Sequence, residues 1–486
     1  MLSRATTVAL VLGSSAAVLV VELVALRLVA PYWGLTLETS TTVIGLALLA
    51  IAAGSWAGGR AADLGPPHRL LAPLLGVSGV VVAATPFAVR GAGVVGDPLV
   101  FLLAVTATLV VPGALLSAVT PVVTKMHLED LAGAGGVVGR LSGISTLGAI
   151  LGTVLTGFVL VTAIPVTGIL VGVGLLLVAS AVAVGMRTHR AAVVPGLALV
   201  LAAGGASVSS ALGPVDCDLE TEYHCVDIRT DPERPEGRLL VMDGVHHSYV
   251  DLGDPTYLDF GYARALVGVL ESRFPDGEPL TAHHLGGGAL TIPRYLAATR
   301  PGTTGTVSEI DPGLVRTDGG LLDTRAVPGL EVRIEDGRRG LLALPPGSLD
   351  LVVGDAFGGV SVPWHLTTRE ALSAVRRVLD EDGLYAANLI DHGVLDFARA
   401  KVATMRAVFP VVTVLLPHDF DGGNVVVVGS TEPLDDVGLD AALAAQGEPS
   451  QVLTDDVLDA WVGDAMVLTD DHAPVDQLLT PYRRVS

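Results

Sequence analysis

The sequence predicts an all-α membrane helical bundle of about seven spans, followed by a small β-rich subdomain and a Rossmann-like α/β domain. Residues 1–212 hold nine Lys and Arg and six Asp and Glu, whereas the rest of the chain holds 20 basic and 44 acidic residues. Apolar stretches of about 20 residues, enough to cross ~30 Å of hydrocarbon, recur along the first part. Short β-rich runs then alternate with helical patterns, which is typical of a parallel sheet with crossover helices. We therefore predict domains at 1–212, 213–279 and 280–486.

The apolar stretches define the predicted membrane helices. They lie at about 6–30, 40–59, 70–89, 98–119, 141–162, 166–186 and 192–212. The first is longer than the ~7–15-residue core of a signal peptide, so we expect it to remain as an anchor. Two glycine pairs with four-residue spacing, Gly54 with Gly58 and Gly148 with Gly152, allow helices to approach closely.

Glu22 is an ionisable residue inside the first span. Such a group costs several kcal/mol unless it is paired or faces water, so Glu22 is a candidate cation site of the membrane region. Arg27 follows five residues later, about 140° around the helix. We expect Arg27 to extend to the membrane interface rather than to pair with Glu22.

The C-terminal part begins with β-rich runs. Segments 223–228 and 238–242 flank a polar turn and predict a small antiparallel set. Segment 280–285 then reads as a strand that runs into Gly286, Gly287 and Gly288 and a helix at 290–299. Glycines at this position let the backbone approach a ligand at a helix N-terminus.

Acids follow the next three predicted strands. Glu309 lies at the tip of the second strand, Asp336 with Gly337 follows the third, and Asp355 follows the fourth. Each acid alone fits a solvated loop residue. Together they lie along the carboxyl edge, where open α/β sheets bind ligands; an acid on the second strand suits a ribose, and one on the third suits adenine.

Several short motifs carry a family resemblance. They are Glu220-Thr-Glu-Tyr223, Asp243-Gly-Val-His-His247, Gly286-Gly-Gly288, Glu309-Ile-Asp311, Asp336-Gly337, Asp355-Ala-Phe357 and Leu366-Thr-Thr-Arg-Glu370, with Glu22-Leu23, Ala30-Pro-Tyr-Trp-Gly34 and Gly58-Gly-Arg60 in the membrane part. In order and spacing, the stretch 220–391 resembles spermidine synthase, a polyamine aminopropyltransferase of methyltransferase-type fold. The whole chain resembles bacterial proteins that fuse a multi-span membrane region to such a domain.

The resemblance implies a reaction and a set of roles. An aminopropyl group would move from decarboxylated S-adenosylmethionine to putrescine or a related amine, with release of methylthioadenosine and without a metal. Asp355 would be the catalytic base, and Glu309 would hold the ribose of the cofactor. Asp336 and Gly337 would contact the adenine, with Gly286 to Gly288 close to the cofactor.

Three departures from the pattern keep other functions open. Family members carry an acid where this chain has Ala289, a second acid where it has Gly358, and a Gln where it has His247. One alternative is transfer of a methyl or other group from S-adenosylmethionine to another acceptor. The other is a polyamine transporter or sensor with a non-catalytic nucleotide-binding domain.

Candidate substrate contacts are His247, Trp364 and His365. Trp364 and His365 lie where the substrate loop of the family would be, and an aromatic face attracts an alkylammonium. The alternative is that Trp364 only pins the loop. The histidines of the chain show no metal-site spacing, which favours structural roles.

The expected partners are a small cationic amine and the lipid bilayer, and a homodimer is one possible assembly. Nucleic acid is excluded, because the acidic C-terminal part offers no basic patch. We expect a multi-pass protein of the cell membrane. If the chain has seven spans and its Lys and Arg lie mainly on the cytoplasmic side, the C-terminal part lies outside the cytoplasm. Cys217 and Cys225 lie just after the last predicted span, where a disulfide would form in an oxidising compartment. The same cysteines also fit two buried thiols, and an eighth span would restore a cytoplasmic enzyme.

Overall fold

The computed structural model describes residues 3–33, 37–95, 97–128, 134–188, 218–315, 327–358, 362–418, 420 and 422–479. The chain divides into two compact units, Met1–Asp216 and Cys217–Ser486. We call them the membrane unit and the C-terminal unit.

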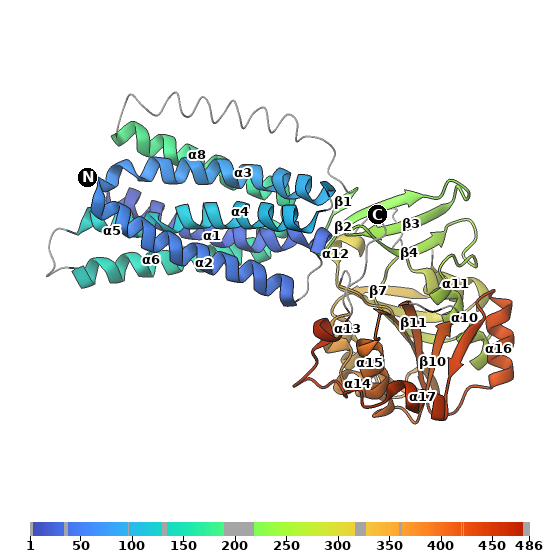
Figure 1. Ribbon diagram of the computed structural model, residues 1–486. Coiled ribbons are helices and arrows are strands. Elements are labelled where there is room, and N and C mark those ends of the chain that lie inside the picture. Colours follow the sequence, from blue (N-terminus) through green and yellow to red (C-terminus); the bar gives the residue numbers. More distant parts are fainter. Residues whose placement is uncertain are drawn as a thin grey trace. The chain divides into compact units, whose positions relative to one another are not determined.

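The membrane unit consists of apolar helices that pack side by side (Figure 1). They are α1 (Arg4–Trp33), α2 (Leu37–Leu64), α3 (Leu71–Val95), α4 (Pro98–Ser117), α5 (Val119–His127), α6 (Ala134–Leu155), α7 (Val161–Ala163) and α8 (Val166–Thr188). Among the described residues, six stretches between Arg4 and Met186 are long and apolar enough to cross a membrane. The first six predicted spans are thereby confirmed as helices, and the predicted span 192–212 lies outside the described residues.

Glycines allow close helix contacts in this unit. A Cβ atom at Gly54 would overlap the carbonyl oxygen of Ala114 in α4, and one at Gly58 would lie 2.5 Å from the Cβ of Ala118. Gly148 and Gly152 of α6 meet the backbone of α1 in the same way. The close approach that the sequence predicts is therefore confirmed for both pairs, because a larger residue would force the helices apart.

Arg27 does not pair with Glu22, as expected, and its position at the membrane interface stays a prediction. Its guanidinium donates to the carbonyl oxygen of Val161 over 3.4 Å, at the point where the π-helical turn η2 (Thr156–Leu160) passes into α7. Arg27 therefore contacts the backbone of a neighbouring helix, and it does not pair with Glu22.

The C-terminal unit opens with a four-stranded antiparallel sheet. Its strands are β1 (Leu219–Glu220), β2 (Cys225–Thr230), β3 (Gly237–Met242) and β4 (Val245–Asp251), in that order. The β3–β4 hairpin turns at Asp243 and Gly244, whose φ angles are 52° and 77°. Asp-Gly suits such a two-residue turn because both positions need positive φ. The β-rich subdomain predicted from the sequence is confirmed.

A sheet of eight strands forms the centre of the unit, in the order β12-β10-β11-β9-β8-β5-β6-β7. Strands β5 to β9 are parallel, and β10 to β12 are antiparallel. The strands are β5 (Thr281–Leu285), β6 (Thr304–Glu309), β7 (Leu330–Ile334), β8 (Leu349–Gly354), β9 (Leu379–His392), β10 (Val411–Pro417), β11 (Gly422–Ser430) and β12 (Ser450–Leu453). This is the methyltransferase-type α/β fold that the sequence predicts.

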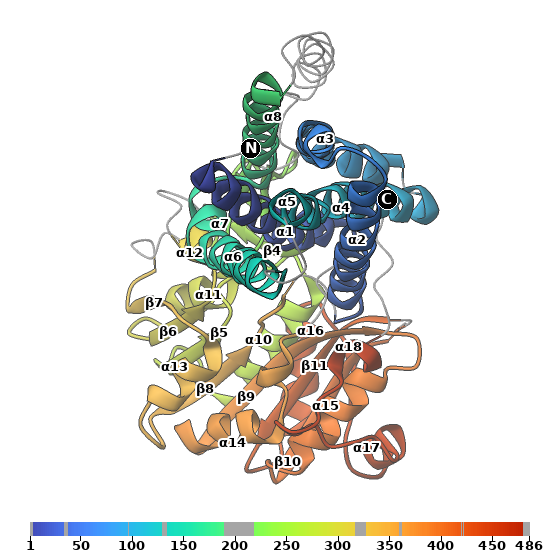
Figure 2. The same ribbon diagram turned by 90° about the vertical axis from the view of Figure 1, so that its left-hand side faces the viewer.

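Helices cover both faces of the large sheet (Figure 2). On one face lie α10 (Gly261–Arg273), α11 (Thr291–Thr299) and α16 (Asp436–Ala445); on the other lie α14 (Arg369–Val378), α15 (Asp396–Arg406) and α17 (Asp455–Val462). Strand β8 shows why two layers are needed: Val352 is buried against one layer, and Leu351 and Val353 against the other.

Strand order also creates the site. From the central β5 the chain builds outward through β6 and β7, and it then returns to the other side of β5 with β8 and β9. At such a reversal the loops after the two central strands diverge and leave a crevice at their carboxyl ends. Gly286 directly follows β5 and Asp355 directly follows β8.

Candidate functional site

The loop after β5 is shaped by its glycines. Gly286 has a φ of 94° and Gly288 a φ of 48°, which side chains disfavour. A Cβ atom at Gly286 would overlap the carbonyl oxygen of Asp355, so the loops after β5 and β8 touch through their backbones. The amide of Gly287 donates to Oε2 of Glu309 over 2.8 Å. The structure thus brings the three predicted glycines together with Asp355 and Glu309.

Asp355 is held by side chains from two other elements. The hydroxyl of Tyr262 in α10 donates to its Oδ2, and Nδ2 of Asn388 in β9 donates to its Oδ1, both over 3.0 Å. Asn424 in β11 donates in turn to Oδ1 of Asn388 over 2.9 Å. Burial raises the pKa of Asp355 to about 6, although both hydrogen bonds favour the charged form. Such a carboxyl is charged at neutral pH and can still accept a proton.

Tyr262 acts as a donor in this contact. Burial, and then the neighbouring Asp355, raise the pKa of Tyr262 well above its usual value. The hydroxyl therefore stays protonated and stabilises the carboxylate of Asp355.

Glu309 closes β6 and is buried, with 7% of its surface exposed. Its Oε1 accepts the amide of Asp311 over 2.8 Å, and its Oε2 accepts that of Gly287. Burial raises the pKa of Glu309, although the two amide hydrogen bonds favour the charged form and act in the opposite direction. Each carboxylate oxygen keeps a further lone pair, which can accept a hydrogen bond from a ribose hydroxyl. Thr221, beside β1, donates to Asp311, so the small sheet reaches the tip of β6.

Asp336 begins helix α13 (Gly337–Ala343). Its Oδ1 accepts the amide of Arg339 over 3.0 Å, and its Oδ2 lies 2.7 Å from Nε2 of His365. Burial opposes the charge of Asp336, but the contacts with His365 and Arg339 hold its pKa below the ordinary value. Gly337 packs closely, since a Cβ there would lie 3.1 Å from Cδ2 of Leu285.

The two loop residues predicted to contact substrate therefore lie near the third strand. His365 pairs with Asp336, and the ring of Trp364 lies 5.9 Å from that of His365. Trp364 is 49% exposed. Its surface is open to a ligand rather than packed into the core.

His247 belongs to a different cluster, in the small sheet. Its ring lies 6.2 Å from that of His224, whose Nδ1 is 2.7 Å from Oδ2 of Asp243. Burial, and then the neighbouring His224, lower the pKa of His247 to about 4, so the ring is neutral. Its Nε2 is buried without a hydrogen-bond partner in the described part of the chain. That nitrogen can serve a ligand.

Ala289 and Gly358 differ strongly in their surroundings. Ala289 is fully buried in an apolar cluster of the small sheet, β6 and the helices beside them, and its amide donates to Oγ of Ser248. Gly358 is exposed. The missing acid at 289 is therefore not a vacant polar position, because the backbone and the apolar neighbours have adapted to alanine.

Tyr262, Asn388 and Asn424 were not found from the sequence. The only signal was Asn388, a polar residue near the carboxyl end of a strand whose preceding positions are apolar. Tyr262 belongs to a helix before β5, and no local pattern relates it to Asp355.

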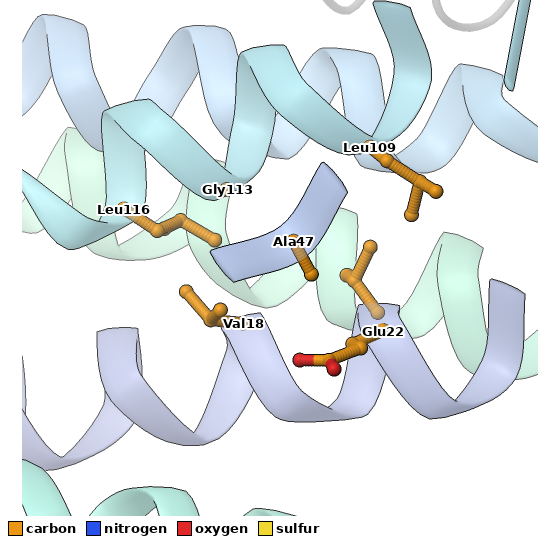
Figure 3. A pocket seen from close by; sticks show the side chains of 7 residues that line it. Val18, Glu22, Ala47, Leu109, Gly113 and Leu116 are labelled. Atoms are coloured by element: carbon orange, nitrogen blue, oxygen red, sulfur yellow. The ribbon is translucent and has the colours of Figure 1, made fainter. Parts of the chain in front are cut away.

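Two further residues considered in the sequence analysis, Glu22 and Cys225, lie outside the group around Asp355, Glu309 and Asp336. Glu22 lines a pocket among α1, α2 and α4 of the membrane unit (Figure 3). Cys225 is disulfide-bonded, and the other cysteine of the chain, Cys217, lies outside the described residues. No metal-binding group of three or more His, Cys, Asp or Glu occurs in the part that the structure describes.

No protein-family model and no curated protein matches the sequence. Among solved structures, the chain is similar to a probable spermidine synthase from Corynebacterium glutamicum, with 29% identity, a TM-score of 0.49, and coverage of 53% of this chain and 97% of that one. It is also similar to spermidine synthase from Thermotoga maritima, with 17% identity, a TM-score of 0.33, and coverage of 52% of this chain and 82% of that one. A third similar structure is human methyltransferase-like protein 13 in complex with SAH, with 19% identity, a TM-score of 0.30, and coverage of 39% of this chain and 88% of that one.

Proposed function

We propose that the protein is a membrane-anchored transferase that moves an aminopropyl group from decarboxylated S-adenosylmethionine to putrescine or a related amine. The observation that carries the proposal is the Asp355 carboxylate, which lies beside the backbone of Gly286 and accepts hydrogen bonds from Tyr262 and Asn388. It combines a base with a glycine loop at the crevice where open α/β sheets bind ligands.

The residues divide the reaction between them. The co-substrate supplies an electrophilic carbon attached to a sulfonium. The amine nitrogen forms a bond to that carbon while the carbon–sulfur bond breaks, and sulfur keeps the electron pair as methylthioadenosine leaves. Asp355 attracts the ammonium form of the acceptor and takes its proton. Glu309 accepts from the ribose, and the Gly286 to Gly288 loop lets the cofactor approach the backbone. We assign the adenine end to Asp336 and Gly337, and the amine to His247, Trp364 and His365.

The by-product tests the proposal. The full-length protein in lipid nanodiscs is incubated with putrescine and either decarboxylated S-adenosylmethionine or S-adenosylmethionine, and products are identified by mass spectrometry. We expect methylthioadenosine and an aminopropylated amine with the first co-substrate. Absence of both, with each of several di- and polyamines, would contradict the proposal.

A second candidate is transfer of a methyl or other group from S-adenosylmethionine to a different acceptor. The specific observation in its favour is Ala289, which is fully buried among apolar side chains and cannot recognise the terminal amine of the decarboxylated co-substrate. Release of S-adenosylhomocysteine in the same assay would favour it. Ligand-induced thermal stabilisation without either by-product would instead favour a sensor.

We also propose that the C-terminal unit lies outside the cytoplasm, in a multi-pass protein of the cell membrane. The disulfide at Cys225 supports this side, because such bonds persist in oxidising compartments. A reporter that works only in the cytoplasm, fused after Ser486, should be inactive. Activity of that reporter, together with free thiols in protein trapped directly from cells, would contradict it.

A further inference from the structure

The membrane unit contains a carboxyl group in an apolar pocket. The pocket is lined by Val18, Val21 and Glu22 of α1, Ala47 of α2, and Leu109, Gly113 and Leu116 of α4. In Figure 3 the Glu22 carboxylate lies on the same side of α1 as Val18, opposite side chains of α2 and α4. Glu22 is seven residues before the end of the span Arg4–Val29, or about 10 Å along the helix axis. The carboxyl is therefore well inside the apolar layer.

Within the described part of the chain, no counter-charge accompanies this carboxyl. Among the described residues, Glu22 has no hydrogen bond or ion pair, and every other residue that lines the pocket is apolar. The charged groups on the neighbouring helices are engaged elsewhere or lie toward helix ends: Arg27 donates to Val161, and Asp63 at the end of α2 pairs with Lys125 of α5. Arg4 and Arg60 lie near the ends of α1 and α2, and α4 has no charged residue between Pro98 and Ser117.

The chemistry of the pocket selects its ligand. Apart from Glu22, every lining residue is apolar. A polyamine carries several ammonium groups, and the pocket offers a single carboxylate. A metal cation needs about six oxygen ligands, and the pocket lining offers one carboxylate. A proton needs only that carboxylate.

The helix opposite has a weak point at this level. Pro112 lies inside α4, directly before the pocket residue Gly113. Proline removes one hydrogen bond of the helix ladder, so α4 can adjust here more easily than a regular helix. A change in charge at Glu22 thus meets a segment that is able to respond.

We propose that Glu22 is a reversible proton-binding site of the membrane unit, neutral when α1, α2 and α4 are packed as in this structure. Loss of the proton leaves a charge in an apolar pocket, which is unfavourable unless water enters or the helices move. Proton uptake and release at Glu22 are therefore coupled to the packing of these three helices. This inference does not depend on the proposed transferase activity.

Labelling with dicyclohexylcarbodiimide tests the proposal, because this apolar reagent reacts with protonated carboxyl groups. The carboxyl O–H adds across a C=N bond of the reagent, and the product rearranges to a stable N-acylurea. The full-length protein in nanodiscs is labelled over a range of pH and analysed by peptide mass spectrometry. We expect adduct at Glu22 in at least about tenfold excess over the paired, exposed Asp63 at neutral pH, with labelling that falls as the pH rises. The isosteric variant Glu22→Gln should lose this adduct, and Glu22→Asp should retain one.

Three results would overturn the proposal. They are labelling of Glu22 no greater than that of Asp63, labelling that does not change with pH, and protection of Glu22 by Na⁺ at constant pH, which would indicate a metal cation. Infrared difference spectra give an independent readout. At neutral pH the wild-type-minus-Glu22→Gln difference spectrum should contain the carbonyl band of a protonated carboxyl, and this band should fade as the pH is raised. A difference spectrum without that band would contradict the assignment.

Discussion

Removing the hydroxyl of Tyr262 should move the acid limb of the pH–rate profile to higher pH. Asp355 must be a carboxylate to accept a proton, so turnover falls as the pH drops through its pKa, which burial raises to about 6. Tyr262 donates to Oδ2 of this carboxylate over 3.0 Å and favours the charged form. A hydrogen bond to a charged group contributes about 1.5–3 kcal/mol, and ~1.4 kcal/mol corresponds to one pKa unit. Water replaces part of the bond in this half-buried site, so Tyr262→Phe should move the acid limb up by about one pH unit.

The assay is kcat/KM for methylthioadenosine release, measured from pH 5 to pH 9 on full-length protein in nanodiscs. Tyr295→Phe is the matched control, because Tyr295 is a buried tyrosine whose hydroxyl contacts Gln446 instead. Its acid limb should match that of the wild-type protein. If Tyr262→Phe loses activity equally at all pH values, or if its acid limb moves to lower pH, the assigned hydrogen bond does not control the charge of Asp355.

Three further predictions concern Asp355, Glu309 and the pair Ala289 and Gly358. Asp355→Asn should lower kcat by roughly 10²–10⁴ while methylthioadenosine still binds in calorimetry; unchanged turnover would remove Asp355 from its role. Glu309→Gln should weaken nucleotide binding by roughly 1–3 kcal/mol and lower the melting temperature, because an amide cannot accept from both Gly287 and Asp311 as the carboxylate does; equal affinity would exclude the ribose contact. Ala289→Asp should lower the free energy of unfolding by about 3 kcal/mol or more, because it forces a charge into an apolar cluster. The control Gly358→Asp, at an exposed position, should change the free energy of unfolding by less than about 0.5 kcal/mol. A stable Ala289→Asp protein that uses putrescine better would show that position 289 accepts a polar side chain.

The burial of Ala289 changes how the departure from the family pattern is understood. A lost acid in an open site could be replaced by a single substitution. Here the neighbours include Leu290 and Val307, which are also fully buried. A carboxylate at position 289 would therefore disturb the packing between the small sheet and β6, so one substitution does not restore the acid of the pattern.

Local sequence patterns determined the elements of this protein. Apolar length predicted the first six long apolar helices, and four-residue glycine spacing predicted the contacts of α2 with α4 and of α6 with α1. Alternating strand and helix patterns predicted the α/β domain. These features depend on residues near one another in the chain, so periodicity and composition are enough to predict them. The glycine loop and the acids after β6, β7 and β8 were found for the same reason.

Only the tertiary structure decided what these residues contact. Asp355 gains its raised pKa from burial among strands distant in sequence, and its partners Tyr262 and Asn388 come from α10 and β9. His365 pairs with Asp336, and Ala289 lies in a core that the small sheet completes. The pocket around Glu22 likewise needs three helices to form. Burial and long-range hydrogen bonds are properties of the packed chain, and they set protonation states and side-chain directions that no local pattern of residues contains.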